Sequence, residues 1–539
     1  MKRRDFIKQT SYTALTLQAF LLSCNSPSNS KEKPHGKQTE NAIAKFELSE
    51  ATVMDLQRMM EEGKYTAQRI AELYIRRIQE VDKDGPRLNS VIEINPEAIQ
   101  IATQLDEERK SGKVRGPLHG IPVLIKDNID TGDKMMTTAG SLALNGHHAM
   151  HDAFLVKKLR EAGAVILGKT NLSEWANFRS TRSSSGWSSR GGQTKNPYVL
   201  NRNPCGSSSG SGTAVSANLC TIAIGTETNG SIACPSSING VVGLKPTVGL
   251  VSRSGIIPIS HTQDTAGPMT RTVADAAILL GVIAGADEAD KVTLESKGKA
   301  YADYTKYLDP NALQGKKIGV EKSFLKEHEA VDALLREALD IMKSKGAEIV
   351  EVDFRSKVNV GESEFDLLQF EFKDGLNRYF SQSHTPVKSL KELIDFNNRH
   401  ADKVMPFFKQ EILEMSEERE DLQSKAYKEA LNKVISTRSL IDKELKQHGI
   451  EAICGPANGP SWCIDLVNGD HFTGYGMYSA AAMAGYPHIT VPMGLVKGLP
   501  IGLTFIASAY QEPQLIGIAY AFEQASKLRA VPEFKESLV

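Results

Sequence analysis

The sequence predicts an α/β fold: a single large domain in which helices cover a central mixed β-sheet, with a helical insertion. Two observations lead to this prediction. Short apolar runs typical of buried strands alternate with segments of helical periodicity over most of the chain. One long stretch, 356–448, is charged and helical in pattern throughout. Alternation of this kind is typical of a sheet with helices packed on it, and the exception indicates an inserted helical region.

The first part of the domain is expected to begin with helices. Residues 48–81 carry apolar side chains at helical spacing, with Ser49 and Thr66 as plausible N-caps. A further helix is expected over 96–111. Then come a short buried strand that ends at Lys126, a helix, a strand and a loop or short helix, over 121–125, 154–162, 165–167 and 171–178.

The centre of the chain, 203–235, consists of two small-residue loops on either side of an apolar run, 217–224. Glycine and serine gather where the backbone must approach something closely and where hydroxyls must point at it. A flexible Gly/Ser linker is the alternative. The flanks favour a functional loop pair, because the run from Thr213 is typical of a buried helix start and 219–224 of a buried strand.

The same alternation continues after this stretch. Strands are expected over 241–250 and 255–258, followed by a helix over 273–284. Two more strands should flank a helix, at 316–320, 330–345 and 348–352. The helical insertion 356–448 precedes the next strand signal, which begins at Glu451. We find no internal repeat, so one domain with an insertion is the prediction.

Composition excludes some classes of partner. The formal net charge of the 539 residues is −1, which provides no field to attract nucleic acid. No apolar run reaches the roughly 20 residues that a membrane-spanning helix needs. His147, His148 and His151 lie in a polar loop, and we expect no metal there. No cofactor is expected either, because the glycine-rich loop lacks the Gly-Lys-Ser/Thr ending of a nucleotide site. The sequence does not indicate an oligomeric state.

The N-terminus has the pattern of a targeting segment. The run from Lys2 to Lys8, with its paired arginines, resembles a twin-arginine export signal, and Leu21-Leu-Ser-Cys24 resembles a lipobox. We therefore expect residues 1–24 to be an export signal, with Cys24 lipidated after cleavage, and 25–45 to be a polar tether. The expected location is periplasmic, with membrane contact only through the lipid. A basic tail with a chance cysteine is the alternative.

Six cysteines are present, at positions 24, 205, 220, 234, 454 and 463. Apart from Cys24, five remain, which cannot all pair, and none has the spacing of a zinc site. A twin-arginine substrate folds before export in a reducing compartment, which disfavours disulfides. We expect buried free thiols and leave open a bridge between Cys454 and Cys463.

Four motifs stand in order along the chain. They are Gly120-Ile-Pro-Val-Leu-Ile-Lys-Asp-Asn-Ile, the pair Gly206-Ser-Ser-Ser-Gly-Ser-Gly-Thr-Ala-Val and Gly225-Thr-Glu-Thr-Asn-Gly-Ser-Ile, Ala484-Gly-Tyr-Pro-His-Ile-Thr-Val-Pro-Met-Gly, and Gly498-Leu-Pro-Ile-Gly-Leu. Together they resemble the amidase signature family over roughly residues 48–528. The run 225–260 is most similar to that family's bacterial peptide amidase branch. By this resemblance the amidase domain spans 46–535, and the 356–448 insertion shapes the substrate cavity.

The resemblance implies a serine hydrolase that cleaves carboxamide C–N bonds through an acyl-enzyme. Ser231 would be the nucleophile, Lys126 the base, and Ser207 the hydroxyl that relays the proton between them. Backbone N–H groups of Thr228, Asn229, Gly230 and Ser231 would form the oxyanion hole. The lysine must be neutral to accept a proton, and burial shifts a lysine pKa in that direction. Trp175, Ala176 and Asn177 would line the acyl side of the pocket, with plain core as the alternative.

Three residues depart from the family pattern, and several alternatives stay open. Asn229 and Ser209 stand where glycine is commoner, and Ala233 stands where many members carry arginine. These departures, with the export signal, argue against the subunit that amidates glutamyl-tRNA. A peptide C-terminal amide is the favoured substrate, and small aliphatic, aryl or lipid amides, or esters, are alternatives.

Two other catalytic mechanisms and one non-catalytic class of protein also remain open. A Ser-His-Asp triad is not excluded, although none of the twelve histidines stands out as its base. Gly206-Ser-Ser-Ser-Gly210 fits the G-x-S-x-G nucleophile elbow with Ser208 attacking, but no buried strand precedes it. The alternative of another class is a non-catalytic exported solute-binding lipoprotein.

Overall fold

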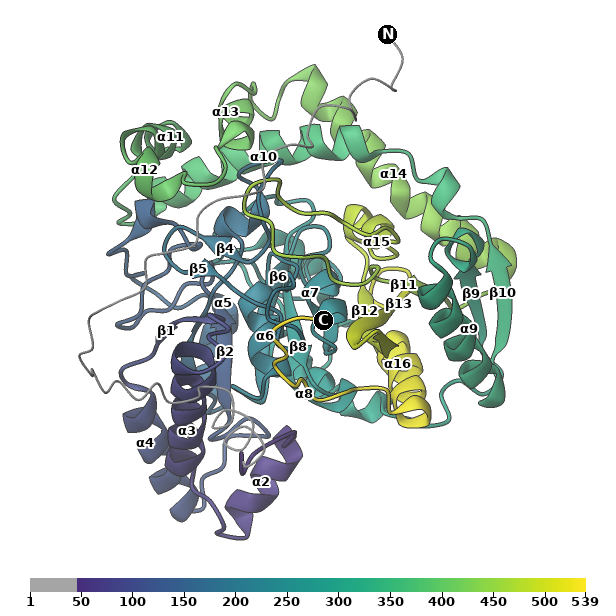
Figure 1. The fold of residues 1–539 in the computed structure, drawn as a ribbon, viewed down its shortest axis with the longest axis horizontal. Helices are drawn as coiled ribbons and strands as arrows, with labels where there is room; N and C mark the ends of the chain where they lie inside the picture. The colour runs from purple at the N-terminus through teal and green to yellow at the C-terminus, as the bar shows by residue number, and fades with distance from the viewer. Residues whose placement is uncertain (1–45) are drawn as a thin grey trace, which may run out of the picture. The chain divides into compact units, whose positions relative to one another are not determined.

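The computed structural model of the protein describes residues 46–539, which form one compact unit (Figure 1). The expected export signal, Cys24 and the expected tether therefore lie outside the described residues. Within 46–539, no helix is both long enough and apolar enough to cross a membrane.

One large mixed sheet organises residues 46–539. Its strands lie in the order β1-β3-β2-β6-β8-β7-β12-β13-β11-β9-β10. The bounds are β1 Val91–Ile94, β2 Pro122–Lys126, β3 Val165–Thr170, β6 Ile222–Glu227, β7 Val242–Lys245, β8 Thr265–Thr270, β9 Lys317–Glu321, β10 Glu348–Val352, β11 Ala452–Pro456, β12 His488–Val496 and β13 Leu499–Ile506. A separate two-stranded ribbon pairs β4 (Trp187–Ser188) with β5 (Gly192–Gln193). The predicted α/β fold with a central mixed sheet is confirmed.

The part of the sheet around Lys126 is β3-β2-β6-β8. β2 is parallel to both β3 and β6, whereas β6 is antiparallel to β8. Every residue of these four strands is buried, as expected of strands covered on both faces. Because β2 and β6 run in the same direction, Lys126 at the end of β2 lies at the same edge as the end of β6.

Helices cover the sheet along its whole length. α6 packs on β6, β2 and β3 and contacts α7, while α8, α16 and α9 form a second contiguous group against the strands. The bounds are α2 Val53–Glu61, α3 Ala67–Arg77, α4 Ala98–Lys110, α5 Phe154–Glu161, α6 Ser209–Ser216, α7 Ala233–Ile238, α8 Val273–Ile283, α9 Glu329–Ser344, α15 Ser479–Ala484 and α16 Glu512–Ser526. A π-helical segment, Ile78–Asp84, continues α3.

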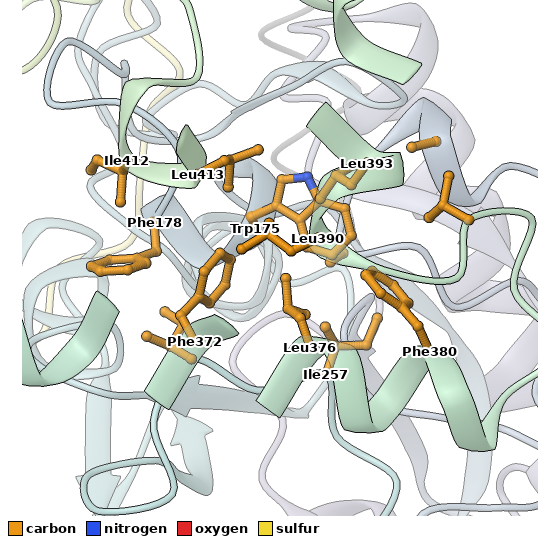
Figure 2. Close-up of a cluster of buried hydrophobic side chains, with 14 of the residues drawn as sticks. Trp175, Phe178, Ile257, Phe372, Leu376, Phe380, Leu390, Leu393, Ile412 and Leu413 are labelled. Atoms are coloured by element: carbon orange, nitrogen blue, oxygen red, sulfur yellow. The ribbon is translucent and has the colours of Figure 1, made fainter. Parts of the chain in front are cut away.

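The predicted insertion is helical throughout, and Figure 1 shows its two long helices as an arch beside the sheet. Its elements are α10 Gly361–Gln382, α11 Leu390–Arg399, α12 Ala401–Val404, α13 Glu411–Glu417 and α14 Lys425–His448. α10 and α14 pack along each other. Figure 2 shows Phe372, Leu376 and Phe380 of α10 packed with Trp175 and Phe178 from the body of the domain. This apolar cluster attaches the insertion to the rest of the domain.

Two strand expectations are wrong, and two strands of the large sheet, β1 and β8, are not among the expected ones. The strand expected over 241–250 is only β7, since Pro246 follows Lys245 and cannot donate to the ladder. The strand expected over 255–258 is a loop with one isolated bridge, Ile129 to Ile256. β8 was not expected at all, because its sequence Thr-Ala-Gly-Pro-Met-Thr carries a glycine and a proline, residues that are depleted in strands.

The N-cap expected at Ser49 is also wrong. The first helix, α2, starts at Val53, and its N-cap is Thr52, whose hydroxyl accepts from the Asp55 N–H at 3.1 Å. Asp55 in turn accepts from the Thr52 N–H, which completes a capping box. Thr66, the other expected N-cap, does cap α3, accepting from the Arg69 N–H.

Thr52→Ala should weaken α2 locally. An N-cap threonine replaced by alanine costs about 1 kcal/mol, so protection of the α2 amides against hydrogen exchange should fall about fivefold. Ser49→Ala is the matched control, because the Ser49 side chain has no capping role in α2. Equal exchange in the two variants would contradict the assignment of Thr52 as the cap.

Candidate active site

Lys126 ends β2 with its side chain completely buried. Its Nζ donates to the hydroxyls of Ser207, Thr226 and Ser208 at 2.8, 2.8 and 3.0 Å. It also lies 3.2 Å from the carbonyl oxygen of Thr226. Neutral oxygens therefore surround the amine, and no carboxylate forms an ion pair with it among the described residues.

This environment lowers the pKa of Lys126 from its ordinary 10.5 to about 7. Burial is the main cause, since a charged amine loses its hydration there. The carboxylates of Asp264 and Glu227 act in the opposite direction and raise the pKa, but by less than burial lowers it. A lysine with such a pKa is half neutral near pH 7 and can accept a proton.

Ser207 and Ser208 lie on the turn that leads into α6, where they face the lysine. Ser207 is 1% exposed and Ser208 is 0% exposed. The Ser208 hydroxyl donates to the Thr226 carbonyl oxygen at 3.0 Å, and the Ser208 N–H donates to the Ser231 carbonyl oxygen at 3.2 Å. Complete burial and this hydrogen bond make Ser208 a structural contact rather than an accessible nucleophile.

Ser231 lies on the turn between β6 and α7 and retains 8% exposure, more than either of the other two serines. Among described residues, no protein acceptor pairs with the backbone N–H groups of Thr228, Asn229, Gly230 and Ser231, the donors expected for the oxyanion hole. The next two N–H groups, of Ile232 and Ala233, donate to Glu227 Oε2 at 2.7 and 3.0 Å. The turn thus presents a hydroxyl beside unpaired N–H donors.

Gly230 is required in this turn for two reasons. Its φ is +85°, in the left-handed region that favours glycine. A Cβ at this position would also lie 2.5 Å from the ring of Tyr478, closer than any real contact. Any larger residue would therefore displace either the turn or the tyrosine.

Glu227 and His488 form a buried pair beneath this turn. His488 Nε2 lies 2.6 Å from Glu227 Oε1, and both side chains are fully buried. Burial raises the pKa of Glu227. His488, Lys245 and the hydrogen bond from the Ala233 N–H lower it by more, so that the pKa falls to about 2. The carboxylate therefore stays ionised and anchors the start of α7. Neither residue was expected as a site residue, although both lie inside the quoted motifs.

The three departures from the family pattern have local contacts. The Asn229 side chain donates to Glu364 of α10 at 2.7 Å and to Ser479 at 3.0 Å. The Ser209 hydroxyl donates to the Cys205 carbonyl oxygen at 2.6 Å. Ala233 contributes only its backbone N–H, which donates a hydrogen bond to Glu227. Asn229 therefore links the turn to the helical insertion.

The expectation that all five cysteines are free thiols is wrong. A disulfide joins Cys205 and Cys234, with their Cα atoms 5.9 Å apart. Cys220 and Cys454 are buried free thiols, whereas Cys463 is free and exposed, so the alternative bridge between 454 and 463 is absent. The bonded cysteines have a sequence separation of 29, and the segment between them includes α6 and β6, whose packing brings the two ends together.

The residues expected on the acyl side, Trp175, Ala176 and Asn177, form a turn in which all three have positive φ. Trp175 is 2% exposed and packs in the apolar cluster of Figure 2. Asn177 accepts from the Ser183 hydroxyl. Ala176 lines a cavity together with Asn128, Thr226, Thr228, Asp264 and the loop 256–261. That cavity adjoins the lysine cluster, because Thr226 contacts both.

No histidine in the described part of the chain is placed as the base of a Ser-His-Asp triad. His488 bonds to Glu227 beneath the Ser231 turn, and His147 bonds to the Tyr379 hydroxyl. Within residues 46–539 no group of His, Cys, Asp and Glu is placed to hold a metal ion.

Comparison with known proteins gives consistent matches. The chain matches the family model described as Amidase over residues 69–516. A probable amidase of Arabidopsis thaliana is 42% identical, covering 91% of this chain and 92% of that protein. A putative amidase of Schizosaccharomyces pombe is 38% identical, covering 91% and 87%. The solved structure of native peptide amidase from Stenotrophomonas maltophilia is 50% identical, with a TM-score of 0.88 over 90% of this chain and 99% of that one.

Glu227→Gln should destabilise the fold by about 3–5 kcal/mol at pH 7, because it removes a buried carboxylate that His488 and two backbone N–H groups pair with. Since the folded pKa of Glu227 is about 2, below the ordinary 4.5, its stabilisation is complete above about pH 4.5. It is lost as pH falls from there toward 2, so the gap in melting temperature between variant and wild type should narrow below about pH 4.5. Glu288→Gln, in an exposed pair with Lys291, is the control and should leave the melting temperature unchanged.

Proposed function

The chain belongs to the amidase family and is an amide-hydrolysing enzyme, and from this premise we propose that Lys126, Ser207 and Ser231 perform its chemistry. The observation that carries the proposal is the buried Lys126 amine, with a pKa of about 7 and a 2.8 Å hydrogen bond to Ser207. An amine in this state can accept a proton from one serine and return it to a leaving nitrogen.

The reaction would proceed in two stages. Ser231 Oγ attacks the amide carbonyl while its proton passes to Ser207, whose own proton moves to neutral Lys126. The relay then runs in reverse, giving a proton to the departing nitrogen as the C–N bond breaks and leaving an ester on Ser231. In the second stage, a water molecule passes a proton to the same relay and attacks the ester. This attack releases the acid and restores the Ser231 hydroxyl.

The unpaired N–H groups at 229–231 support an oxyanion hole beside Ser231. Negative charge develops on the carbonyl oxygen during attack, and preorganised N–H donors stabilise it. Glu227 holds the two following N–H groups, so the free donors stay next to Ser231. Loss of one oxyanion donor typically costs about 3–4 kcal/mol of transition-state stabilisation.

Peptide C-terminal amides are our proposed substrates. The support is the 50% identity to the Stenotrophomonas maltophilia protein that is named a peptide amidase. Small aliphatic, aryl or lipid amides, or esters, are the alternative substrates within the same chemistry. A non-catalytic exported solute-binding lipoprotein has no support from the comparisons. Export and lipid attachment at Cys24 stay predictions from the sequence.

Turnover should fall on the acid side of pH 7 as Lys126 becomes protonated, about tenfold per unit well below its pKa. Lys126→Ala removes the base and should reduce kcat by about 10²- to 10⁴-fold or more. Lys157→Ala, at an exposed lysine, is the control and should keep the wild-type pH–rate profile. Wild-type turnover in Lys126→Ala would refute the proposed mechanism.

A serine-reactive fluorophosphonate should label Ser231, identified by peptide mass spectrometry, and Ser231→Ala should abolish the label. Labelling of Ser208 instead would favour the nucleophile elbow, and no labelling at all would favour a binding protein. The same preparation should release ammonia from peptide amides faster than from short aliphatic or aryl amides. The opposite order would overturn the proposed substrate while leaving the amidase assignment intact.

A further inference from the structure

We propose that the Cys205–Cys234 disulfide positions Ser207 against Ser231, so that full turnover requires the oxidised protein. This inference rests on the proposed roles of the two serines. Cys205 lies two residues before Ser207, and Cys234 lies three residues after Ser231. The bridge therefore joins the two turns that carry the relay.

The two turns belong to different parts of the chain and need something to hold them together. Ser207 precedes α6, whereas Ser231 follows β6. Within residues 46–539 no hydrogen bond joins the Ser207 and Ser231 hydroxyls, so the backbones of the two turns set their separation. One backbone hydrogen bond, from the Ser208 N–H to the Ser231 carbonyl oxygen, spans the turns at 3.2 Å. The disulfide adds a covalent link at the same place.

A hydrogen bond on each side of the disulfide connects it to the turn that carries the adjoining serine. The Ser209 hydroxyl donates to the Cys205 carbonyl oxygen at 2.6 Å, which closes the turn around Ser207. The Cys234 N–H donates to the Gly230 carbonyl oxygen at 2.8 Å, which closes the turn around Ser231. A displacement at either sulfur would therefore move the adjoining serine.

The bridge is also part of a packed apolar cluster. Cys205 and Cys234 are 1% and 2% exposed and pack with Ile238 and Trp462, and Tyr478 lies against this cluster. The Tyr478 ring is the group that a Cβ at position 230 would strike. The cluster thus packs against the Ser231 turn through Tyr478, and the lysine's own hydrogen bonds do not include the bridge.

The first test compares two double variants. Cys205→Ala/Cys234→Ala should lower kcat about 10- to 100-fold with KM within about twofold, because small misplacements of reacting groups carry large rate penalties. Its acid-side pH dependence should not move, because Lys126 stays buried. Cys220→Ala/Cys454→Ala removes two buried free thiols and is the matched control, with kcat expected within about twofold of wild type. A bridge-less variant with wild-type kcat would overturn the proposal.

The second test uses the unmutated chain, in case the variant does not fold. Protein produced under reducing conditions should contain two extra titratable thiols and show the lowered kcat. Oxidised glutathione then takes two electrons and two protons from the dithiol and is itself reduced, and kcat should rise as those thiols disappear. Full kcat before oxidation would contradict the proposal. Absence of amide hydrolysis in the oxidised wild type would instead count against the proposed function, so the two failures are distinguishable.

Discussion

The candidate site depends on the removal of water from one amine, that of the Lys126 side chain. Lys126 is placed by β2 at an edge where β6 also ends, so its side chain meets hydroxyl and carbonyl oxygens rather than water. The same strands that bury the amine bring Thr226 to it, and the turn after β6 carries Ser231. The sheet topology therefore sets both the burial of the lysine and the location of Ser231, the proposed nucleophile.

The two carboxylates near this amine, Glu227 and Asp264, do not contact it, because each is paired with other groups. Glu227 is ionised but satisfied by His488 and by two backbone N–H groups, so its charge anchors a helix start instead of pairing with the lysine. Asp264 accepts from the Thr228 hydroxyl and from backbone N–H groups of 259 and 260. Direct contact of either carboxylate with Lys126 would favour the charged amine and remove the base.

The sequence predicts local features well and long-range pairings poorly. An apolar run that ends at Lys126 predicts β2, whereas the role of Lys126 comes only from the resemblance to the family; Thr66 is a correct cap because its signal is local. β8 escapes prediction because Gly267 and Pro268 contradict strand propensity, and its stabilising contacts with β6, β7, α6 and α8 exist only in the folded chain. The Cys205–Cys234 bridge and the Glu227–His488 pair join residues whose proximity exists only in the folded sheet.

The helical insertion contributes no hydrogen bond to Lys126, and this has a consequence for how the sequence of the insertion can change. Lys126 and the turns that carry Ser207 and Ser231 lie at the edge of the sheet, whereas α10 to α14 attach through an apolar cluster (Figure 2), through the packing of α14 on α15 and through contacts such as Asn229 with Glu364. Substitutions on the arch at positions other than Glu364 leave the hydrogen bonds of Lys126 untouched, because none of its partners lies within 356–448. Over evolutionary time the arch can therefore diverge while the contacts of the buried amine stay the same.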